Sequence, residues 1–596
     1  MLERQIRGMI DDVKCGRLSR RAFLSRMMAA GIGLPTAGML LSHAGGANAQ
    51  SSFVYKPVKA GGGGTLRILQ WQAATFLNPH LATGSKDWYG SGVFYEPLAG
   101  WDSDGNLVPF LAAEIPSIEN GDVARDGTSV VWKLKRGVTW HDGTPFTADD
   151  CVFNWDYARD PATAAYTTGT YRDITVEKLD SHTIRIVFKT PTPFWADAFV
   201  GTRGMLIPKH LFEAYKGAAS RDSPHNLKPV GTGPYLFDTF RPGDVLHARR
   251  NPNYHVPAKP YFDAVDIKGG GDATSAARAV MQTEDYDFAY NLQVEDAVLK
   301  RMEAAGKGKI DIVPSAHIEH IQLNASDPWS EVDGERGSPK SRHPIFSDKR
   351  VRQALTMLVD RGSIQTGIYG RDASATANFL NAPPRFVSKN TKWAFAVDKA
   401  AALLDEAGWK PGADGIRQKD GRRFKLVFQT ATNSLRQKTQ MVIKHACGKA
   451  GIEVELKTVE AGVFFSSDPA NPDNIGHFYA DLQMYTSPLN QPDPGAFMQQ
   501  FLSDQISSKA NNWQARNVTR WRNAEFDETY RACQAEMDPV KRAVLAIRLN
   551  DLVVEDVAVI PVVTRKVLAG MKKNIQASLS AWEAYTWDLG SWYREG

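Results

Sequence analysis

Residues 132–146 read Trp-Lys-Leu-Lys-Arg-Gly-Val-Thr-Trp-His-Asp-Gly-Thr-Pro-Phe, and this stretch with its flanks decides the fold. The β-branched and aromatic residues of 130–134 predict a strand. Asp142-Gly143 is typical of a tight turn. Thr147 is followed three residues later by Asp150, a spacing that resembles a capping box and predicts the start of a helix. The stretch therefore predicts a strand, a turn and a helix in quick succession.

Further strands are expected around this stretch. Residues 65–69 follow a run of four glycines and predict the first strand after a flexible leader. Residues 174–176 and 184–188 are rich in β-branched side chains and flank the turn residues Asp180-Ser181. This pattern indicates a hairpin, so the first half of the chain is predicted to be rich in strands.

The second half of the chain has a different pattern. Apolar residues at helical spacing predict helices over 347–362 and 398–408, each ended by a glycine. Residues 424–428 and 452–456 predict strands, and 435–450 between them predict a helix. A strand, a helix and a strand within about 35 residues form a βαβ unit, which favours a parallel sheet. The expected fold class is therefore α/β.

The N-terminus carries features of an export signal. Ser-Arg-Arg-Ala-Phe-Leu at 19–24 precedes a modest apolar run at 27–41 and a small-residue site, Ala-Asn-Ala, at 47–49. This order is typical of a removable secretory signal, and the twin arginine indicates the Tat type, with the Tat translocase as export partner. The alternative is a membrane anchor, but the run is shorter than the roughly 18–20 residues that span a bilayer. Residues 1–49 are predicted to be removed, leaving a soluble periplasmic protein from Gln50.

Charge and length narrow the function classes. The whole chain has 71 Lys and Arg against 66 Asp and Glu, and the signal holds seven and three of them. The mature chain therefore has 64 against 63, a net charge of about +1, which does not favour a nucleic-acid partner. About 547 residues remain after cleavage, enough for two or more domains.

Neither a cofactor nor a metal is expected. The sequence has no Walker A loop, HExxH or G-x-S-x-G motif. His317 and His320 lie in a strand-like stretch, where residues three apart point to opposite faces. Three cysteines remain after cleavage, Cys151, Cys447 and Cys533, and this odd, sparse set favours buried thiols while leaving one disulfide open.

Aromatic and neutral polar residues follow several predicted strands. Ligands of open α/β sheets bind beyond the carboxyl ends of strands, and such sites combine aromatic walls with a few placed polar groups. We therefore expect a binding protein rather than an enzyme; the alternatives are an exported hydrolase and a periplasmic chaperone. The candidate ligand contacts are Trp71, Gln72, Trp88, Tyr290, Asn291, Gln293, Tyr485, Thr486 and Asn490.

Several motifs in a fixed order carry a family resemblance. They are Tyr95-Glu-Pro-Leu98, the stretch 132–150, Gly231-Thr-Gly-Pro-Tyr235, Asn251-Pro-Asn-Tyr254, Arg350-Val-Arg-Gln-Ala-Leu355 and Leu403-Leu-Asp-Glu-Ala-Gly-Trp409. Together they resemble family 5 extracellular solute-binding proteins, the peptide/nickel-type receptors of ABC importers. The resemblance covers nearly all of residues 65–596.

The resemblance implies a two-lobed α/β fold like the type II periplasmic binding proteins, with a β-rich subdomain in lobe I. Lobe I is expected over 50–317, lobe II over 318–557, and a return segment to lobe I over 558–596. Two hinge crossovers are expected near 312–318 and 557–563. The implied cycle is hinge closure on a ligand by a monomer, followed by docking onto the membrane subunits of an ABC permease.

The resemblance specifies the chemical class of the ligand less closely than it specifies the fold. Peptide-binding relatives place a Trp and then an Asp that pairs with the peptide's α-amino group; here Tyr485 and Pro488 stand near those places, with Asn490 as a substitute. The loop 429–433 lacks the Arg that dipeptide binders use for the carboxylate, and Arg436 is a displaced substitute. We therefore expect a neutral, aromatic cleft for a peptide or peptide-like solute, with an opine or an oligosaccharide as alternatives.

Overall fold

The computed structural model describes most of the chain after residue 52. The ranges are 53–103, 105–304, 306–370 and 373–595, together with Met9, Asp12, Leu18, Phe23 and Arg26. The predicted export signal over residues 1–49 lies outside the described residues except for these five. Within the described ranges, every helix is too short or too polar to cross a bilayer.

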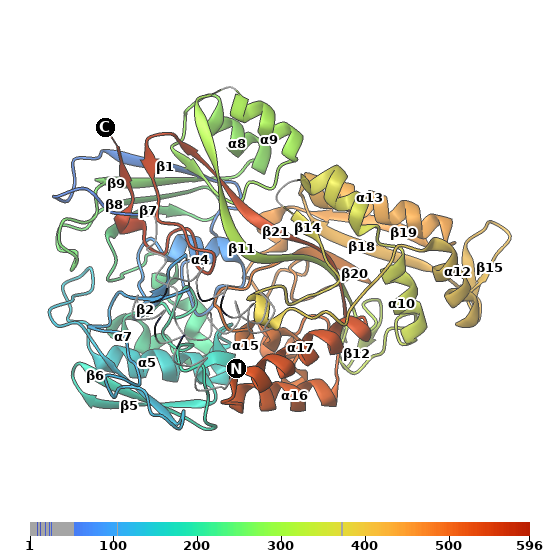
Figure 1. The fold of residues 1–596 in the computed structure, drawn as a ribbon, viewed down its shortest axis with the longest axis horizontal. Coiled ribbons are helices and arrows are strands. Elements are labelled where there is room, and N and C mark those ends of the chain that lie inside the picture. Colours follow the sequence, from blue (N-terminus) through green and yellow to red (C-terminus); the bar gives the residue numbers. More distant parts are fainter. Residues whose placement is uncertain are drawn as a thin grey trace.

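One mixed sheet runs through the described part of the molecule and has eleven strands (Figure 1). Ten strands follow one path, and β14 (Ala373–Ala375) pairs with β21 beside it. The order along the path is β19 (Glu453–Val459), β18 (Lys425–Ala431), β20 (Leu482–Ser487), β11 (Gly308–Leu323), β21 (Val559–Lys572), β10 (Phe288–Ala289), β1 (Thr65–Gln70), β9 (Ala264–Gly269), β8 (Val245–Arg250) and β7 (Tyr235–Arg241).

Strands β11 and β21 join the two lobes. They pair antiparallel from Gly308 opposite Lys572 to Gln322 opposite Val559. One end of this ribbon pairs with β10 of lobe I, and the other end pairs with β20 of lobe II. The register shifts between Val313 and His317, between the two lobes. The two-lobed α/β fold is confirmed, while the lobe boundaries at residues 317 and 557 stay predictions.

The quoted stretch forms a hairpin-rich subdomain of lobe I, at the lower left of Figure 1. Strand β6 (Thr183–Phe188) lies between β4 (Ser129–Lys133) and β5 (Ile174–Asp180). Helix α5 (Ala148–Arg159) begins with the predicted capping box of Thr147 and Asp150. Trp132 and Trp140 are fully buried in the core of this lobe. The predicted strand, turn and helix are all present.

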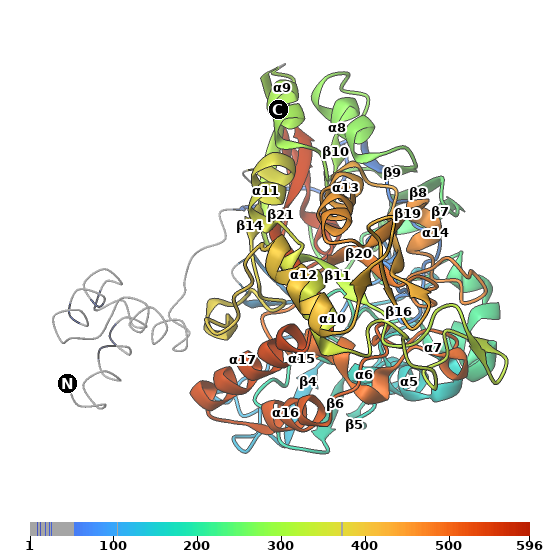
Figure 2. The ribbon, with the colours of Figure 1, turned by 90° about the vertical axis from the view of Figure 1, so that its right-hand side faces the viewer.

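Lobe II contains the predicted βαβ unit. Strands β18 and β19 are parallel, with Lys425 opposite Glu453, and helix α13 (Ser434–Lys449) connects them. Figure 2 shows α10 (Lys349–Met357), α12 (Val397–Glu406) and α13 over this end of the sheet. The prediction that Gly362 ends the first of these helices is wrong. Helix α10 ends at Met357, and Gly362 lies inside α11 (Arg361–Ile364), because Asp360 caps a new helix.

The other helices and strands complete the two lobes. The remaining helices are α4 (Ser85–Ser91), α6 (Thr168–Tyr171), α7 (Lys209–Phe212), α8 (Ala273–Met281), α9 (Asp296–Ala304), α14 (Ala461–Phe464), α15 (Gly495–Met498), α16 (Ala524–Ala535) and α17 (Pro539–Glu555). The remaining strands are β2 (Ala99–Trp101), β3 (Leu107–Pro109), β12 (Glu331–Val332), β13 (Glu335–Arg336), β15 (Lys410–Pro411), β16 (Arg417–Lys419), β17 (Arg422–Arg423), β22 (Ile575–Gln576) and β23 (Tyr593–Arg594).

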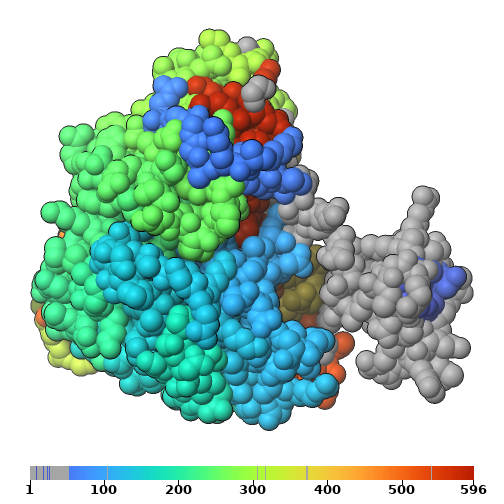
Figure 3. All heavy atoms as spheres, turned by 90° about the vertical axis from the view of Figure 1, so that its left-hand side faces the viewer, coloured from blue at the N-terminus to red at the C-terminus, as the bar shows by residue number. Residues whose placement is uncertain are grey.

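The C-terminal segment returns to lobe I and packs against the first described residues. The Tyr593 hydroxyl donates to the carbonyl of Val54 at 3.1 Å, and the ring of Tyr593 contacts Phe53. Figure 3 shows this C-terminal segment, in red, beside the N-terminal residues in blue. The C-terminal segment therefore lies in lobe I, where it contacts the residues at the start of the range 53–103.

The three cysteines of the mature chain are buried free thiols. Cys151, Cys447 and Cys533 form no disulfide with one another in the structure. Burial raises the pKa of the Cys447 thiol to about 12. Because the thiolate is the reactive species, this thiol is inert at neutral pH.

Candidate ligand-binding site

The site lies where the ends of two strands from different lobes meet. In lobe I, strand β1 is followed by helix α4. In lobe II, strand β20 ends at Ser487 and is followed by a loop. Two adjoining cavities lie between them, of about 880 Å3 (the main cavity) and about 450 Å3 (the side cavity), open mouths included. The residues that line both cavities are Ser85, Phe465, Thr486 and Pro488. The two cavities therefore adjoin at these four residues, and together they are called the cleft.

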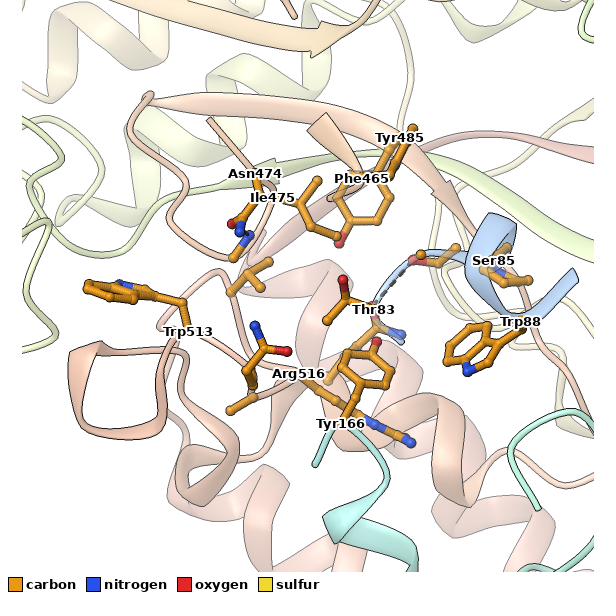
Figure 4. Close-up of a pocket in the computed structure, with 18 of the residues that line it drawn as sticks. Thr83, Ser85, Trp88, Tyr166, Phe465, Asn474, Ile475, Tyr485, Trp513 and Arg516 are labelled. Carbon is orange, nitrogen blue, oxygen red and sulfur yellow. Dashed lines mark hydrogen bonds between the residues drawn. The ribbon is translucent and has the colours of Figure 1, made fainter. Parts of the chain in front are cut away.

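Aromatic side chains from both lobes form walls of the main cavity (Figure 4). Trp88 and Tyr166 come from lobe I, whereas Phe465, Tyr485 and Trp513 come from lobe II. The Trp88 indole N–H donates to the carbonyl of Pro79 at 3.1 Å, which holds the ring in place. These walls offer flat apolar surface to a ligand on both sides of the cleft.

Two arginines also line the main cavity. The guanidinium carbon of Arg203 lies 5.2 Å from the ring centre of Trp88, and that of Arg516 lies 5.3 Å from the ring centre of Tyr166. Figure 4 shows Arg516 beside Tyr166. Both contacts are of the cation–π type. The burial of Arg203, helped by the nearby positive charge of Arg516, lowers the pKa of Arg203 to about 10, so the Arg203 guanidinium stays charged at neutral pH.

Several guanidinium nitrogen atoms of Arg203 and Arg516 have no hydrogen-bond partner among the described residues. Arg516 is 5% exposed and donates from Nη1 to the carbonyl of Ala496 at 2.5 Å. Its Nε and Nη2, and Nε of Arg203, are buried and have no hydrogen-bond partner among the described residues. Asp197 is an acid that interacts electrostatically with both arginines. Burial raises the pKa of Asp197, and the positive charge of Arg516 opposes that rise. This end of the cleft thus has two cations near one carboxyl group.

A second arginine pair lines the side cavity. Arg436, from the first turn of α13, donates from Nε and Nη2 to the Glu319 carboxylate at 3.1 Å each. Arg565 of β21 places its Nε 3.5 Å from the same carboxylate, and Thr486 also donates to it. Burial alone raises the pKa of Glu319, but the two guanidiniums outweigh it and hold the pKa at about 2. Nη1 of Arg436 is buried and unpartnered in the described part of the chain.

Neutral polar groups surround this second pair. Burial, and the charge of Arg565 after it, lowers the pKa of His317 to about 3, so its imidazole is neutral. Its Nδ1 lies 2.6 Å from the hydroxyl of Ser315. The side-chain oxygen of Asn291 accepts hydrogen bonds from Arg565 at 2.6 Å and from Gln293 at 3.1 Å. The side cavity thus combines two guanidinium groups with uncharged hydrogen-bonding groups, and it is also lined by Lys86, whose ammonium group pairs with Asp87.

The two lobes are closed around the cleft. Thr83 of lobe I donates from its backbone and its hydroxyl to the hydroxyl of Ser467, at 2.9 Å each, and Ser467 donates onward to Asp87 at 2.8 Å. On the opposite side of the side cavity, Asn433 of lobe II donates to Gln293 of lobe I at 2.8 Å. These bonds exist only while the lobes are in contact, so the structure shows the closed state.

Six of the nine predicted contact residues line one of the two cavities. Trp88 and Tyr485 line the main cavity, Gln72, Asn291 and Gln293 line the side cavity, and Thr486 lines both. Three residues lie elsewhere. The indole of Trp71 is buried behind the cleft, where it donates to the carbonyl of Asn291 at 3.1 Å. All nine stay predictions as ligand contacts.

The other two predicted residues lie outside both cavities. Tyr290 packs its ring against Tyr585 and Tyr89 in the core of lobe I. Asn490 lines a third, smaller cavity that also contacts Arg203 and Pro488, next to the main one. Strand-end position alone does not separate a core ring from a cleft ring, because both kinds follow the end of a strand.

The expectation of a neutral cleft is wrong. Arg203, Arg516 and Arg565 were not predicted, and Arg436, which was named as a displaced substitute, does line the side cavity. No Asp or Glu is among the described residues that line the two cavities. The four arginines come from separate parts of the chain without a shared motif. Only the fold brings them together, so the sequence offered no signal beyond the position of Arg436 after the β18 loop.

The groups present suit binding rather than coordination of a metal. In the described ranges, no three His, Cys, Asp or Glu side chains gather as metal ligands. The site instead offers charged donors, neutral amides and aromatic faces. Such a set can hold a polar organic molecule by hydrogen bonds and ring contacts.

Comparison with known proteins identifies the family. Residues 106–509 match the family model described as bacterial extracellular solute-binding proteins, family 5 middle. The oligopeptide-binding protein AppA of Bacillus subtilis is 28% identical over 434 residues, which cover 71% of this chain and 74% of AppA. The glutathione-binding protein GsiB of Escherichia coli (strain K12) is 23% identical over 504 residues, which cover 84% of this chain and 89% of GsiB.

Solved structures share the fold. The structure of AppA in complex with a nonapeptide has a TM-score of 0.77 and 24% identity, and the likeness covers 91% of this chain and all of AppA. MoaA of A. tumefaciens R10, in complex with mannopinic acid, has a TM-score of 0.74 and 21% identity, covering 90% of this chain and all of MoaA. These relatives are binding proteins rather than enzymes. The chain belongs to family 5 of the bacterial extracellular solute-binding proteins.

Proposed function

We propose that the protein is the periplasmic receptor of an ABC importer. It captures a peptide or peptide-like solute between its lobes and delivers it to the membrane permease. The observation that carries this proposal is the cleft itself, in which a cavity of about 880 Å3 is lined by both lobes and closed by interlobe hydrogen bonds. AppA and GsiB, which bind an oligopeptide and glutathione by their names, support the ligand class.

The architecture supports a cycle of opening and closing. Strands β11 and β21 are the continuous connections between the lobes, and their register shifts between Val313 and His317. Hinge closure needs a few residues that absorb a change of backbone angle, commonly at such irregular points. A solute bound in the cleft contacts both lobes and so stabilises the closed state. The predicted lobes 50–317 and 318–557 are the bodies that move.

An opine is the second candidate ligand. The described residues that line the cleft include no carboxylate to pair with a peptide's α-amino group. Asp493, the acid that follows the Tyr485 segment, is buried in an ion pair with Arg542 instead. The complex of MoaA with mannopinic acid shows that this fold accepts an opine. An oligosaccharide, the other alternative, would leave the arginines without a charged partner.

A thermal-shift screen of the mature protein from Gln50 tests the proposal. The compounds are di- and oligopeptides, glutathione, opines and oligosaccharides, each at several concentrations. A ligand at 100 times its dissociation constant adds about 2.7 kcal/mol to stability, which raises the melting temperature by a few degrees. Saturable stabilisation by a peptide, glutathione or an opine supports the receptor. Turnover of any compound would contradict it in favour of a hydrolase.

We also propose export through the Tat translocase, with cleavage after Ala49. The support is the twin arginine ahead of a short apolar run. The double substitution Arg20→Lys with Arg21→Lys is expected to keep the precursor in the cytoplasm, measured by cell fractionation. Arg7→Lys, outside the motif, is the matched control and leaves export unchanged. Normal export of the double variant would contradict the Tat assignment.

A further inference from the structure

We infer that the cleft is built for a solute with two anionic groups, one for each arginine pair. The inference rests on the proposed receptor function and names the charge of its ligand. It follows from three features of the cleft, namely the charge balance at each end, the unpartnered guanidinium N–H groups and the adjoining position of the two cavities.

The side cavity has one positive charge in excess. Arg436 and Arg565 face a single carboxylate, Glu319, and all three side chains are at most 6% exposed. The other ionisable groups that line this cavity do not change the balance. His317 is neutral, and the ammonium group of Lys86 is paired with Asp87 at 2.9 Å. Buried Nη1 of Arg436 is therefore a charged donor that lacks an acceptor in the described protein.

The main cavity repeats this arrangement with different residues. Arg203 and Arg516 share the influence of one acid, Asp197, and Asp197 itself does not line the main cavity. Arg516 has two unpartnered nitrogen atoms, Nε and Nη2. Asp493, the next acid in this region, is paired with Arg542. At this end of the cleft, too, the lining guanidinium groups outnumber the acids, since no Asp or Glu is among the described residues that line the main cavity.

The two pairs stand at separate places in one space. Of the main and side cavities, Arg203 and Arg516 line the main one alone, and Arg436 and Arg565 line the side one alone. The cavities meet at Phe465 and three other shared residues. A solute that fills both therefore meets a guanidinium pair at each end, with aromatic and hydroxyl groups between them.

A buried cation without a partner is costly, and a matching anion removes the cost. Guanidinium groups pair with carboxylates by short, charge-assisted hydrogen bonds of defined geometry. One carboxylate at each end gives every arginine pair a balanced charge and uses the free N–H groups. The solute expected from this arrangement is a dicarboxylate of peptide-like or opine-like size.

Calorimetric titration with matched compounds tests the inference. The panel is glutathione, mannopinic acid and dipeptides with acidic side chains, each compared with its two monoamides and its diamide. Each amidation removes one negative charge at nearly constant shape. We expect the diacid to bind best and each amidation to weaken binding about 10- to 100-fold, as expected for loss of a charged hydrogen bond.

Two variants assign the charges to their ends. Arg436→Gln leaves Arg565 to balance Glu319, and Arg516→Gln leaves Arg203 beside Asp197, so each variant keeps a balanced interior. We expect each variant to bind the diacid about 10- to 100-fold more weakly than wild type does. Each variant should bind one of the two monoamides as well as wild type does, and this monoamide should differ between the two variants. Arg249→Gln, an exposed arginine of β8, is the matched control and leaves the affinity unchanged.

The possible outcomes separate this inference from the proposed function. If a diamide or a neutral peptide binds as tightly as its diacid, the inference is overturned and the receptor function stands. The same conclusion follows if each variant loses the same affinity for the diacid, the monoamides and the diamide. In that case the arginines have a structural role, because such a role does not depend on the charge of the ligand. If no diacid of the panel binds while a neutral peptide from the thermal-shift screen does, the inference is overturned and the receptor function stands.

Discussion

Two buried carboxylates in different parts of the molecule are satisfied in opposite ways. Glu583, in the interior of lobe I, accepts hydrogen bonds from the backbone N–H groups of Trp101 and Thr202 and from the Thr202 hydroxyl, at 2.6 to 2.8 Å. No cation pairs with it in the described part of the chain, and burial raises its pKa to about 7. Glu319, which pairs with two arginines that line the side cavity, has a pKa of about 2.

The comparison of Glu583 with Glu319 distinguishes a polar site whose groups are all satisfied within the protein from one that leaves groups free for a ligand. At Glu583 neutral donors converge on the carboxyl group, and the group can be neutral when protonated. At Glu319 the donors outnumber the acceptors, and charged N–H groups remain buried beside a cavity. A structural site is expected to satisfy its own groups, whereas a binding site leaves groups for its ligand.

Removal of the Glu319 carboxylate is expected to have the largest effect. Glu319→Ala leaves Arg436 and Arg565 buried without a counter-charge, and breaking a buried ion pair in this way costs about 3–5 kcal/mol. We expect a clear fall in the denaturant midpoint of the ligand-free protein. Glu453→Ala, at an exposed pair with Arg423, is the control and costs less than about 1 kcal/mol. Equal loss in both variants would remove the distinction drawn for Glu319.

The pH dependence of stability sharpens the comparison. Because the folded pKa of Glu583 lies above its unfolded value of 4.5, its contribution is fully present below pH 4.5 and is lost as pH rises through about 7. The loss amounts to about 3 kcal/mol. Glu319 has the opposite sign, since its contribution is present above pH 4.5 and is lost as pH falls through about 2.

Chemical denaturation of wild type and Glu583→Gln across pH 4.5 to 7.5 measures this slope. The stability of the wild type relative to Glu583→Gln should fall by about 3 kcal/mol over this range. Glutamine cannot ionise, so the variant lacks this part of the slope whatever its absolute stability. A constant difference between the two proteins would show that Glu583 titrates normally.

The interlobe hydrogen bonds give a smaller effect. Ser467→Ala removes the acceptor for Thr83 and one donor to Asp87, while Asp87 keeps its bonds from Thr75 and Phe76. A neutral hydrogen bond contributes about 1 kcal/mol, so the closed state should lose about fivefold in population relative to the open state. We expect faster dissociation of the best ligand from the screen, measured by stopped flow. Ser503→Ala, away from the cleft, is the control; equal dissociation rates would show that these bonds do not hold the lobes closed.

An exposed ion pair between the lobes gives the smallest expected effect. Lys438 of lobe II lies 2.7 Å from Glu295 of lobe I, with side chains 53% and 30% exposed. Exposed pairs of this kind contribute less than about 1 kcal/mol and are screened by salt. Lys438→Gln should therefore bind ligand within about twofold of wild type, and at high salt the two should be equal. A larger loss would show that Lys438 takes part in closure.

Much of the local fold could be predicted from the sequence. The capping box at Thr147 and the βαβ unit around α13 depend on residues close together in the chain, and both are present. The end of α10 was misplaced, because Asp360 caps a new helix before Gly362 is reached. Local signals of this kind compete, and the sequence alone does not rank them.

The candidate site was predicted only in part. Trp88 and Tyr485 line the cleft as expected, yet Tyr290 packs into the core of lobe I. A ring after a strand is compatible with either place until the packing of neighbouring segments is known. Arg203 and Arg516, separated by more than 300 residues, meet in one cavity through the closure of the two lobes.

The sequence by itself determined the strands, helices and caps, the family, and the predicted route of export. These properties depend on short-range patterns, in which each residue acts through its near neighbours. Only the tertiary structure decided the charge of the cleft, because that charge is a sum over arginines and acids from distant segments. Burial then sets which of those charges are paired and which remain free for a ligand.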